Sequence, residues 1–145
     1  MKLFSQQADG REEKGPLYEI LLKQLRLHDE ISFIDKMAQD YIPYRERVAS
    51  LQLYLLEAAR AGDLTAQRAY VQAVNELARM VKALMKRLNL AKGCTVTYSG
   101  SLFKAQDWVL TPFVEAVAEL GGVVIPPQRE PVEGAIHLAM KERQK

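Results

Sequence analysis

Residues 95–125, which read TVTYSGSLFKAQDWVLTPFVEAVAELGGVVI, decide the fold class of this chain. The β-branched and aromatic residues of 95–98 are typical of a short strand, and a tight turn of small residues follows at 99–101. Apolar residues then recur at helical spacing over 113–120, and a glycine pair ends that helix. The β-branched residues of 123–125 indicate a second short strand.

The residues around this stretch extend the alternation. Thr111 and Pro112 suit the cap and first residue of the helix, because a first helical position needs no amide donor. A proline-rich loop at 126–131 leads to a last helix expected at about 132–142. Strand, helix, strand and helix in this order predict parallel strands joined by a right-handed crossover.

The first half, up to about Asn89, has the pattern of helices almost throughout. We expect helices at about 16–27, 29–41 and 43–61, and the third is apolar enough to be buried on most sides. In the second helix the apolar stripe is predicted to consist of Ile31, Ile34, Met37 and Ala38.

A fourth helix, from about Asp63 to Leu88, has the most regular pattern. Asp63 is a good N-cap, and the apolar residues behind it step by three or four positions over about seven turns. We expect this helix to be the core of an α-rich α/β fold, with residues 1–145 forming a single domain. Residues 1–14 are polar without a clear period and are expected to form a loose arm.

The composition excludes several classes of protein. Apolar residues make up 48% of the 145 residues and charged residues 26%, as in an ordinary soluble domain. A net charge of +2 is too small to indicate a nucleic-acid or membrane partner, and we expect neither. The single cysteine, Cys94, cannot form an internal disulfide or a metal site alone, which favours a reducing compartment and a cytoplasmic location.

The turn at 99–101 is a candidate binding site. It follows the carboxyl end of a predicted strand, where open α/β sheets bind ligands, and small residues let a ligand approach the backbone. The alternative is an ordinary turn, and the segment matches neither phosphate-loop nor dinucleotide motifs. Gly134 and Ala135 open the last helix and suit close packing equally well. His28 and His137 have no partner at catalytic or metal-ligand spacing.

Four segments form a pattern in chain order. Residues 9–11 read DGR; residues 58–63 read AARAGD, with Ala66 three positions later; residues 96–104 read VTYSGSLFK; and residues 126–139 read PPQREPVEGAIHLA. Together they resemble the BadF/BadG/BcrA/BcrD-type ATPase family, which includes bacterial and animal N-acetylglucosamine kinases. The resemblance spans nearly the whole chain.

The resemblance implies the C-terminal lobe of an actin-like, ribonuclease H-like ATPase fold. It implies ATP as the cofactor, with Mg²⁺ in a complete two-lobe protein. Ser101 replaces a family glycine, which places the affinity for the nucleotide in doubt. The cofactor-binding residues implied are Ser99, Gly100, Ser101, Leu102, Lys104 and Gly134.

The family's N-terminal lobe has no counterpart in these residues. That lobe carries an Asp-Gly-Gly-x-Thr phosphate loop and a catalytic aspartate, so we expect no catalytic residue here and a chain that is incomplete as an enzyme. The partner expected is a separate N-terminal lobe or a second copy. A helical interaction module that kept the fold but lost the ligand is the alternative. The iron–sulfur branch of the family needs two cysteines per subunit, so no cluster is expected with Cys94 alone.

Overall fold

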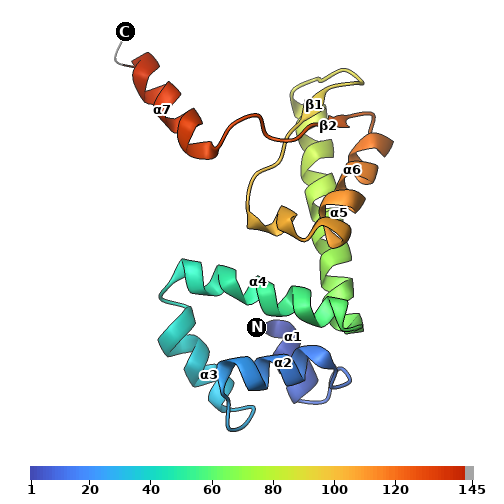
Figure 1. Ribbon diagram of the computed structural model, residues 1–145. Coiled ribbons are helices and arrows are strands. Elements are labelled where there is room, and N and C mark those ends of the chain that lie inside the picture. The colour runs from blue at the N-terminus through green and yellow to red at the C-terminus, as the bar shows by residue number, and fades with distance from the viewer. Residues whose placement is uncertain (143–145) are drawn as a thin grey trace. The chain divides into compact units, whose positions relative to one another are not determined.

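The computed structural model describes residues 1–142, and the chain divides into two compact units, Met1–Gln72 and Ala73–Lys145 (Figure 1). Helices dominate, and a two-stranded parallel sheet lies in the second unit. The prediction of an α-rich α/β chain is therefore confirmed. The single domain over 1–145 and the actin-like lobe stay predictions, and residues 143–145 lie outside the described part.

The first unit consists of helices joined by short loops. The π-helical turn η1 continues α3 without a break, and α5 begins in this unit. The elements are α1 (Lys2–Ala8), α2 (Pro16–Leu25), α3 (Ser32–Lys36), η1 (Met37–Tyr41), α4 (Arg45–Arg60) and α5 (Leu64–Arg87).

The expected loose arm at 1–14 is wrong, because α1 is part of the core. Phe4 is buried and its ring stacks on Tyr18 with centroids 5.5 Å apart. The same ring lies 4.3 Å from that of Phe33. A single aromatic residue in a polar segment gives no periodic signal, although its burial is enough to fix a two-turn helix.

The apolar stripe predicted for the second helix is right at Met37, which is buried, and wrong at its other three positions, which are exposed. Ile31 and Ile34 are 74% and 66% exposed, whereas Phe33, outside the predicted stripe, is buried one helical turn before Met37. The prediction that the third helix is buried on most sides is also wrong. Within α4, Ala58 and Ala59 are the residues described as buried.

The fourth predicted helix is observed as α5, with Asp63 as its cap. The Ala66 amide donates to Asp63 Oδ1 at 2.8 Å. Ala66 and Tyr70 are buried in the first unit, but Leu84 and Leu88 near the far end are exposed. This helix is therefore a core element over part of its length, not along the whole predicted stripe.

Asp63 also caps a second helix. Although 2% exposed, it accepts at Oδ2 from the Leu17 amide of α2 at 2.8 Å and from Gln7 Nε2 of α1 at 3.1 Å. Gly15, just before α2, leaves room for this carboxylate, since a Cβ there would lie 2.7 Å from Asp63 Oδ2. One buried side chain thus joins α1, α2 and α5 through hydrogen bonds to two helix N-termini.

A partly buried polar cluster ties the loop between α2 and α3 to the start of α2. The Tyr18 hydroxyl donates to Glu30 Oε1 at 2.6 Å, and Lys14 Nζ donates to the same oxygen at 2.9 Å. The Tyr18 hydroxyl first, and then Lys14, lower the pKa of Glu30 from 4.5 to about 2. The bond to Glu30 raises the pKa of Lys14 in turn.

This cluster predicts an acid-sensitive contribution to stability. Because the folded state depresses the pKa of Glu30, its contribution is fully present above pH 4.5 and is lost as pH falls through about 2. Glu30→Gln should therefore lower the melting temperature above pH 4.5, and the difference from wild type should vanish near pH 2. Glu13→Gln, at an exposed glutamate of the same unit, is the control. An unchanged difference across this range would contradict the prediction.

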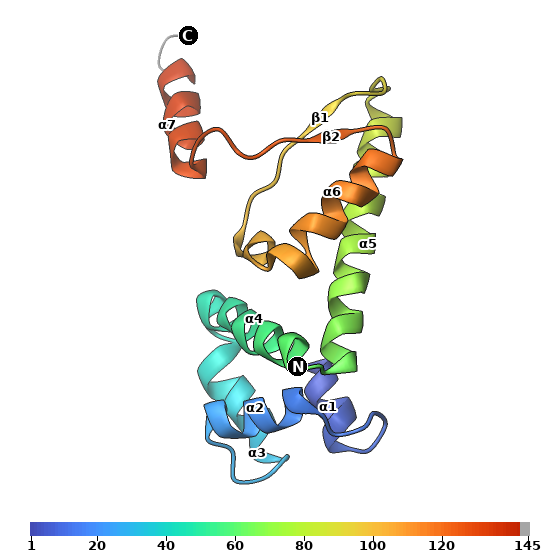
Figure 2. The ribbon, with the colours of Figure 1, turned by 45° about the vertical axis from the view of Figure 1, so that its right-hand side comes forward.

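The second unit contains the predicted strand–helix–strand–helix order. β1 and β2 pair in parallel, with Thr95 opposite Val123, and they run side by side in Figure 2. Each strand is two residues long, shorter than predicted, and α6 begins just before Thr111. The elements are β1 (Thr95–Val96), the 3₁₀ turns η2 (Ser101–Lys104) and η3 (Gln106–Trp108), α6 (Leu110–Glu119), β2 (Val123–Val124) and α7 (Pro131–Glu142).

The core of this unit surrounds α6. Val109, Phe113 and Val117 are buried at successive helical turns. Gly122 fits tightly behind them, because a Cβ there would lie 2.8 Å from Val117 Cγ1. Its amide also donates to the Val117 carbonyl at 3.0 Å, which ends α6 and directs the chain into β2.

Candidate functional site

An open cleft lies where the loops that follow β1 and β2 meet. Parallel pairing brings the carboxyl ends of the two strands to the same edge of the sheet, so these loops are neighbours. The cleft has a volume of about 1090 Å³. It is lined by Thr97, Tyr98, Ser99, Gly100, Ser101, Lys104, Ile125, Pro126, Pro127, Gln128, Arg129, Glu130, Pro131 and Glu133.

The first wall of the cleft is anchored by aromatic contacts. The rings of Tyr98 and Phe103 lie 4.9 Å apart, and Phe103 meets the buried Phe113 of α6 edge-on at 5.4 Å. Gly100, between them, has φ +114° and ψ 159°, a conformation that residues with a Cβ rarely adopt. No atom lies within 4 Å of the position a Cβ would occupy, so the backbone here is open to a ligand.

The second wall is the proline-rich loop with the first turn of α7. The Ile125 amide donates to the Val96 carbonyl at 2.9 Å, which ties the start of this loop to β1. Pro126 and Pro127 then present apolar rings without amide donors.

Charged side chains reach the cleft from both loops. Lys104 comes from the first loop and Arg129 from the second, and Glu130 and Glu133 line the same cleft. The ion pairs found within residues 1–142 involve neither cation. Both cations are therefore placed to meet an anionic ligand, while the two carboxylates can accept hydrogen bonds from hydroxyl groups.

The structure brings together four of the six residues predicted to bind the cofactor. Ser99, Gly100, Ser101 and Lys104 line the cleft. Leu102 is half-buried and does not line it, and Gly134 lies one residue beyond the lining residue Glu133.

The sequence-based prediction did not include residues 125–131, which form the second wall of the cleft. Residues 125–131 carried a signal, since the predicted parallel strands place the segment after the second strand beside the turn at 99–101. Tyr98 was assigned to the strand, whereas β1 ends at Val96 and leaves Tyr98 in the loop. Because β1 ends at Val96, Thr97 and Tyr98 belong to the loop and line the cleft.

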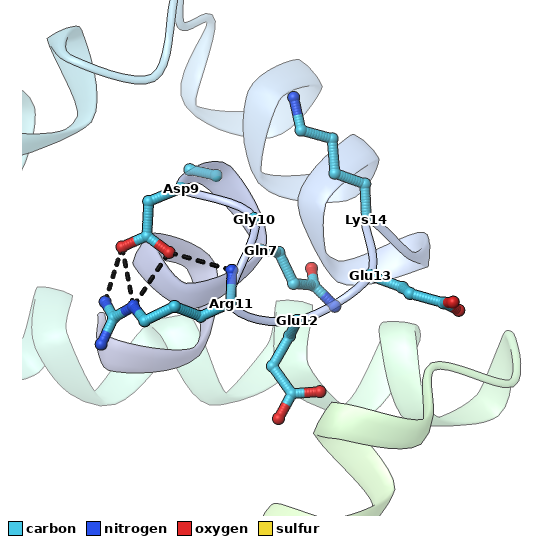
Figure 3. A pocket seen from close by; sticks show the side chains of 8 residues that line it. Gln7, Asp9, Gly10, Arg11, Glu12, Glu13 and Lys14 are labelled. Carbon is cyan, nitrogen blue, oxygen red and sulfur yellow. Dashed lines mark hydrogen bonds and ion pairs between the residues drawn. The ribbon is translucent and has the colours of Figure 1, made fainter.

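A second, shallower hollow lies inside the loop at 7–14. Figure 3 shows Gln7 within this loop and Asp9 facing Arg11. Arg11 Nη2 lies 2.6 Å from Asp9 Oδ2, and this hydrogen-bonded pair lowers the pKa of Asp9. Gln7 Nε2 donates to Asp63, and Gly10 has φ +82°. These residues form the turn between α1 and α2, so we assign the hollow a structural role.

Across 1–142 no group of three or more His, Cys, Asp or Glu side chains is arranged to hold a metal ion. No helix in the same range has the length and apolar character to cross a membrane.

Comparison with known proteins gives one family. No curated protein matches the chain. The family model described as BadF/BadG/BcrA/BcrD ATPase family matches residues 1–139, and that span includes both loops of the cleft.

Proposed function

Since this chain belongs to the BadF/BadG/BcrA/BcrD ATPase family, we propose that its cleft binds ATP and that the chain is the nucleotide-binding C-terminal lobe of a sugar kinase or ATPase. The specific enzyme that we propose is an N-acetylglucosamine kinase. The observation that carries the proposal is that Ser99, Gly100, Ser101 and Lys104 line one cleft at the carboxyl end of both strands.

The residues of the cleft suit the parts of a nucleotide. Gly100 leaves the backbone accessible, so a flat base can lie against it, with Tyr98 and the rings of Pro126 and Pro127 providing apolar surface. Lys104 and Arg129 supply positive charge for phosphate oxygens. When bound with Mg²⁺, ATP would supply the phosphoryl group for transfer, and this chain would hold its adenosine side.

We also propose that a second lobe, supplied by another polypeptide or by a second copy of this chain, completes the enzyme. The cleft is open, so a large part of a bound nucleotide would stay in water. We expect an affinity in the millimolar range, about −4 kcal/mol. The chain alone should hydrolyse no ATP above background, because phosphoryl transfer depends on positioning groups that the cleft does not contain.

A titration followed by NMR tests the nucleotide site. Adding ATP to the labelled protein should shift the signals of 99–104 and 125–131, and Gly100→Val should abolish these shifts. A Cβ at Gly100 both fills the open backbone and opposes the φ of +114°. Gly10→Val is the matched control, since Gly10 also has positive φ and open space around its Cβ position but belongs to the other unit.

Absence of shifts at several millimolar ATP would contradict nucleotide binding at the affinity expected. That result would favour the second candidate, an interaction module that retains the fold without the ligand. One observation supports this alternative: Val132, Ile136 and Met140 of α7 are exposed at i, i+4 and i+8, and such an apolar stripe is typical of a helix that packs against a partner.

A further inference from the structure

Phe103 lies behind the first wall of the cleft and is not among the described residues that line it. The centroid of its ring lies 4.9 Å from that of Tyr98, which does line the cleft, and 5.4 Å from that of Phe113. Phe113 is 3% exposed and belongs to α6, so three rings in contact join the cleft wall to the core of the second unit. Phe103 can therefore affect a ligand in the cleft only through the residues that it holds in place.

The backbone around Phe103 is only weakly fixed by its own hydrogen bonds. Phe103 belongs to the single 3₁₀ turn η2, and the bond from its amide to the Gly100 carbonyl is 3.4 Å long. Gly100 has φ +114°, and a glycine has many other conformations open to it where no contact restrains it. The next firm anchor is Ala105, which is 1% exposed and whose carbonyl accepts from the Val109 amide at 2.8 Å. The packing of Phe103 is thus a main restraint on the turn between Gly100 and Ala105.

The direction of the Phe103 side chain also sets the direction of Lys104. Successive side chains of a 3₁₀ helix point about 120° apart, because about three residues complete a turn. With Phe103 turned toward Phe113, Lys104 is turned to the surface, where it is exposed and lines the cleft. Phe103 therefore restrains two lining residues, Tyr98 through ring contact and Lys104 through the turn.

We propose that Phe103 is a positioning residue of the nucleotide site, an inference that rests on the function proposed above. It holds the Tyr98 ring beside the position of the base and Lys104 beside the position of the phosphates before the nucleotide arrives. Ordering a loop on binding lowers affinity, and a site whose binding-competent form is only partly populated binds more weakly by that fraction. Phe103 keeps the first wall in its competent form.

Phe103→Leu tests the proposal, because leucine keeps an apolar side chain against Phe113 but removes both ring contacts. Aromatic pairs contribute about two- to tenfold to an equilibrium constant beyond the area that they bury. We expect the NMR shifts of 125–131 per unit of added ATP to fall about fivefold. The shifts caused by inorganic triphosphate at matched ionic strength should fall likewise, since Lys104 is also affected. Phe103→Tyr keeps the ring and should restore both responses.

Val117→Ala is the control for a loss of stability alone. Val117 is buried one helical turn beyond Phe113 and is not among the described residues that line the cleft, so its truncation weakens the core without changing a ring contact. Melting curves followed by Trp108 fluorescence establish the temperature at which every variant is folded. At that temperature, Val117→Ala should leave both titrations unchanged.

Equal weakening by Val117→Ala and Phe103→Leu would overturn the proposal, because lower stability would then explain both. Unchanged binding in Phe103→Leu, or a loss with only one of the two ligands, would also overturn it. Absence of ATP-induced shifts in the wild-type chain would instead contradict the nucleotide site itself, and with it this inference. The two failures are therefore distinguished by the wild-type titration.

Discussion

Asp63→Ala is expected to lower the free energy of unfolding of the first unit by about 3–5 kcal/mol. The change removes the caps of α2 and α5, at about 1 kcal/mol each. It also leaves the buried Gln7 amide without its acceptor, which costs about 1–3 kcal/mol more. Urea denaturation followed by helical circular dichroism measures the loss, and faster hydrogen exchange at the Leu17 and Ala66 amides locates it.

Asp29→Ala is the matched control. Asp29 Oδ1 also accepts from a backbone amide, that of Ser32 at 2.7 Å, but this bond is exposed and serves one short helix. Its loss should cost less than about 1 kcal/mol. If the two variants were equally stable, Asp63 would not be the shared anchor that its three hydrogen bonds indicate.

Phe113→Ala is expected to destabilise the second unit by about 3–5 kcal/mol, the usual cost of truncating a buried phenylalanine. Phe113 is 3% exposed, and its ring supports Phe103, which in turn supports Tyr98 beside the cleft. The fluorescence of Trp108, the single tryptophan of the chain, reports on this unit.

Val114→Ala, one position further along α6, is the control because Val114 is exposed. It should change stability by less than about 0.5 kcal/mol. The Phe113 variant should also broaden the NMR signals of 98–103, since the loop loses its support. Sharp, unshifted signals there would mean that the loop holds its shape without the aromatic contacts.

Patterns among residues close together in the sequence were sufficient to predict much of the fold. The length of α5 and its cap at Asp63 follow from spacing and one residue type, and so does the parallel order of β1 and β2. Ser99, Gly100, Ser101 and Lys104 were identified as candidates because the end of a parallel strand is where such loops meet ligands.

The wrong or missing predictions have one cause: they depend on packing between residues that are far apart in the sequence. Ile34 and Phe33 both lie at helical spacing from Met37, and the choice between them depends on Phe4, which lies far away in the sequence. The second cap made by Asp63 depends on Leu17, 46 residues earlier. Neither relation leaves a periodic trace in the sequence, so spacing alone could not predict it.

The distance along the chain between Leu17 and Asp63 also matters during synthesis. A ribosome adds about 5–20 residues per second, so α2 waits roughly 2–9 s for the carboxylate that caps it. A helix of this size relaxes in about a microsecond or less. Over that interval α2 forms and melts repeatedly with Leu17, Leu21 and Leu25 uncovered. Slowing translation just before codon 63 should therefore lengthen this exposure and increase aggregation of the nascent chain.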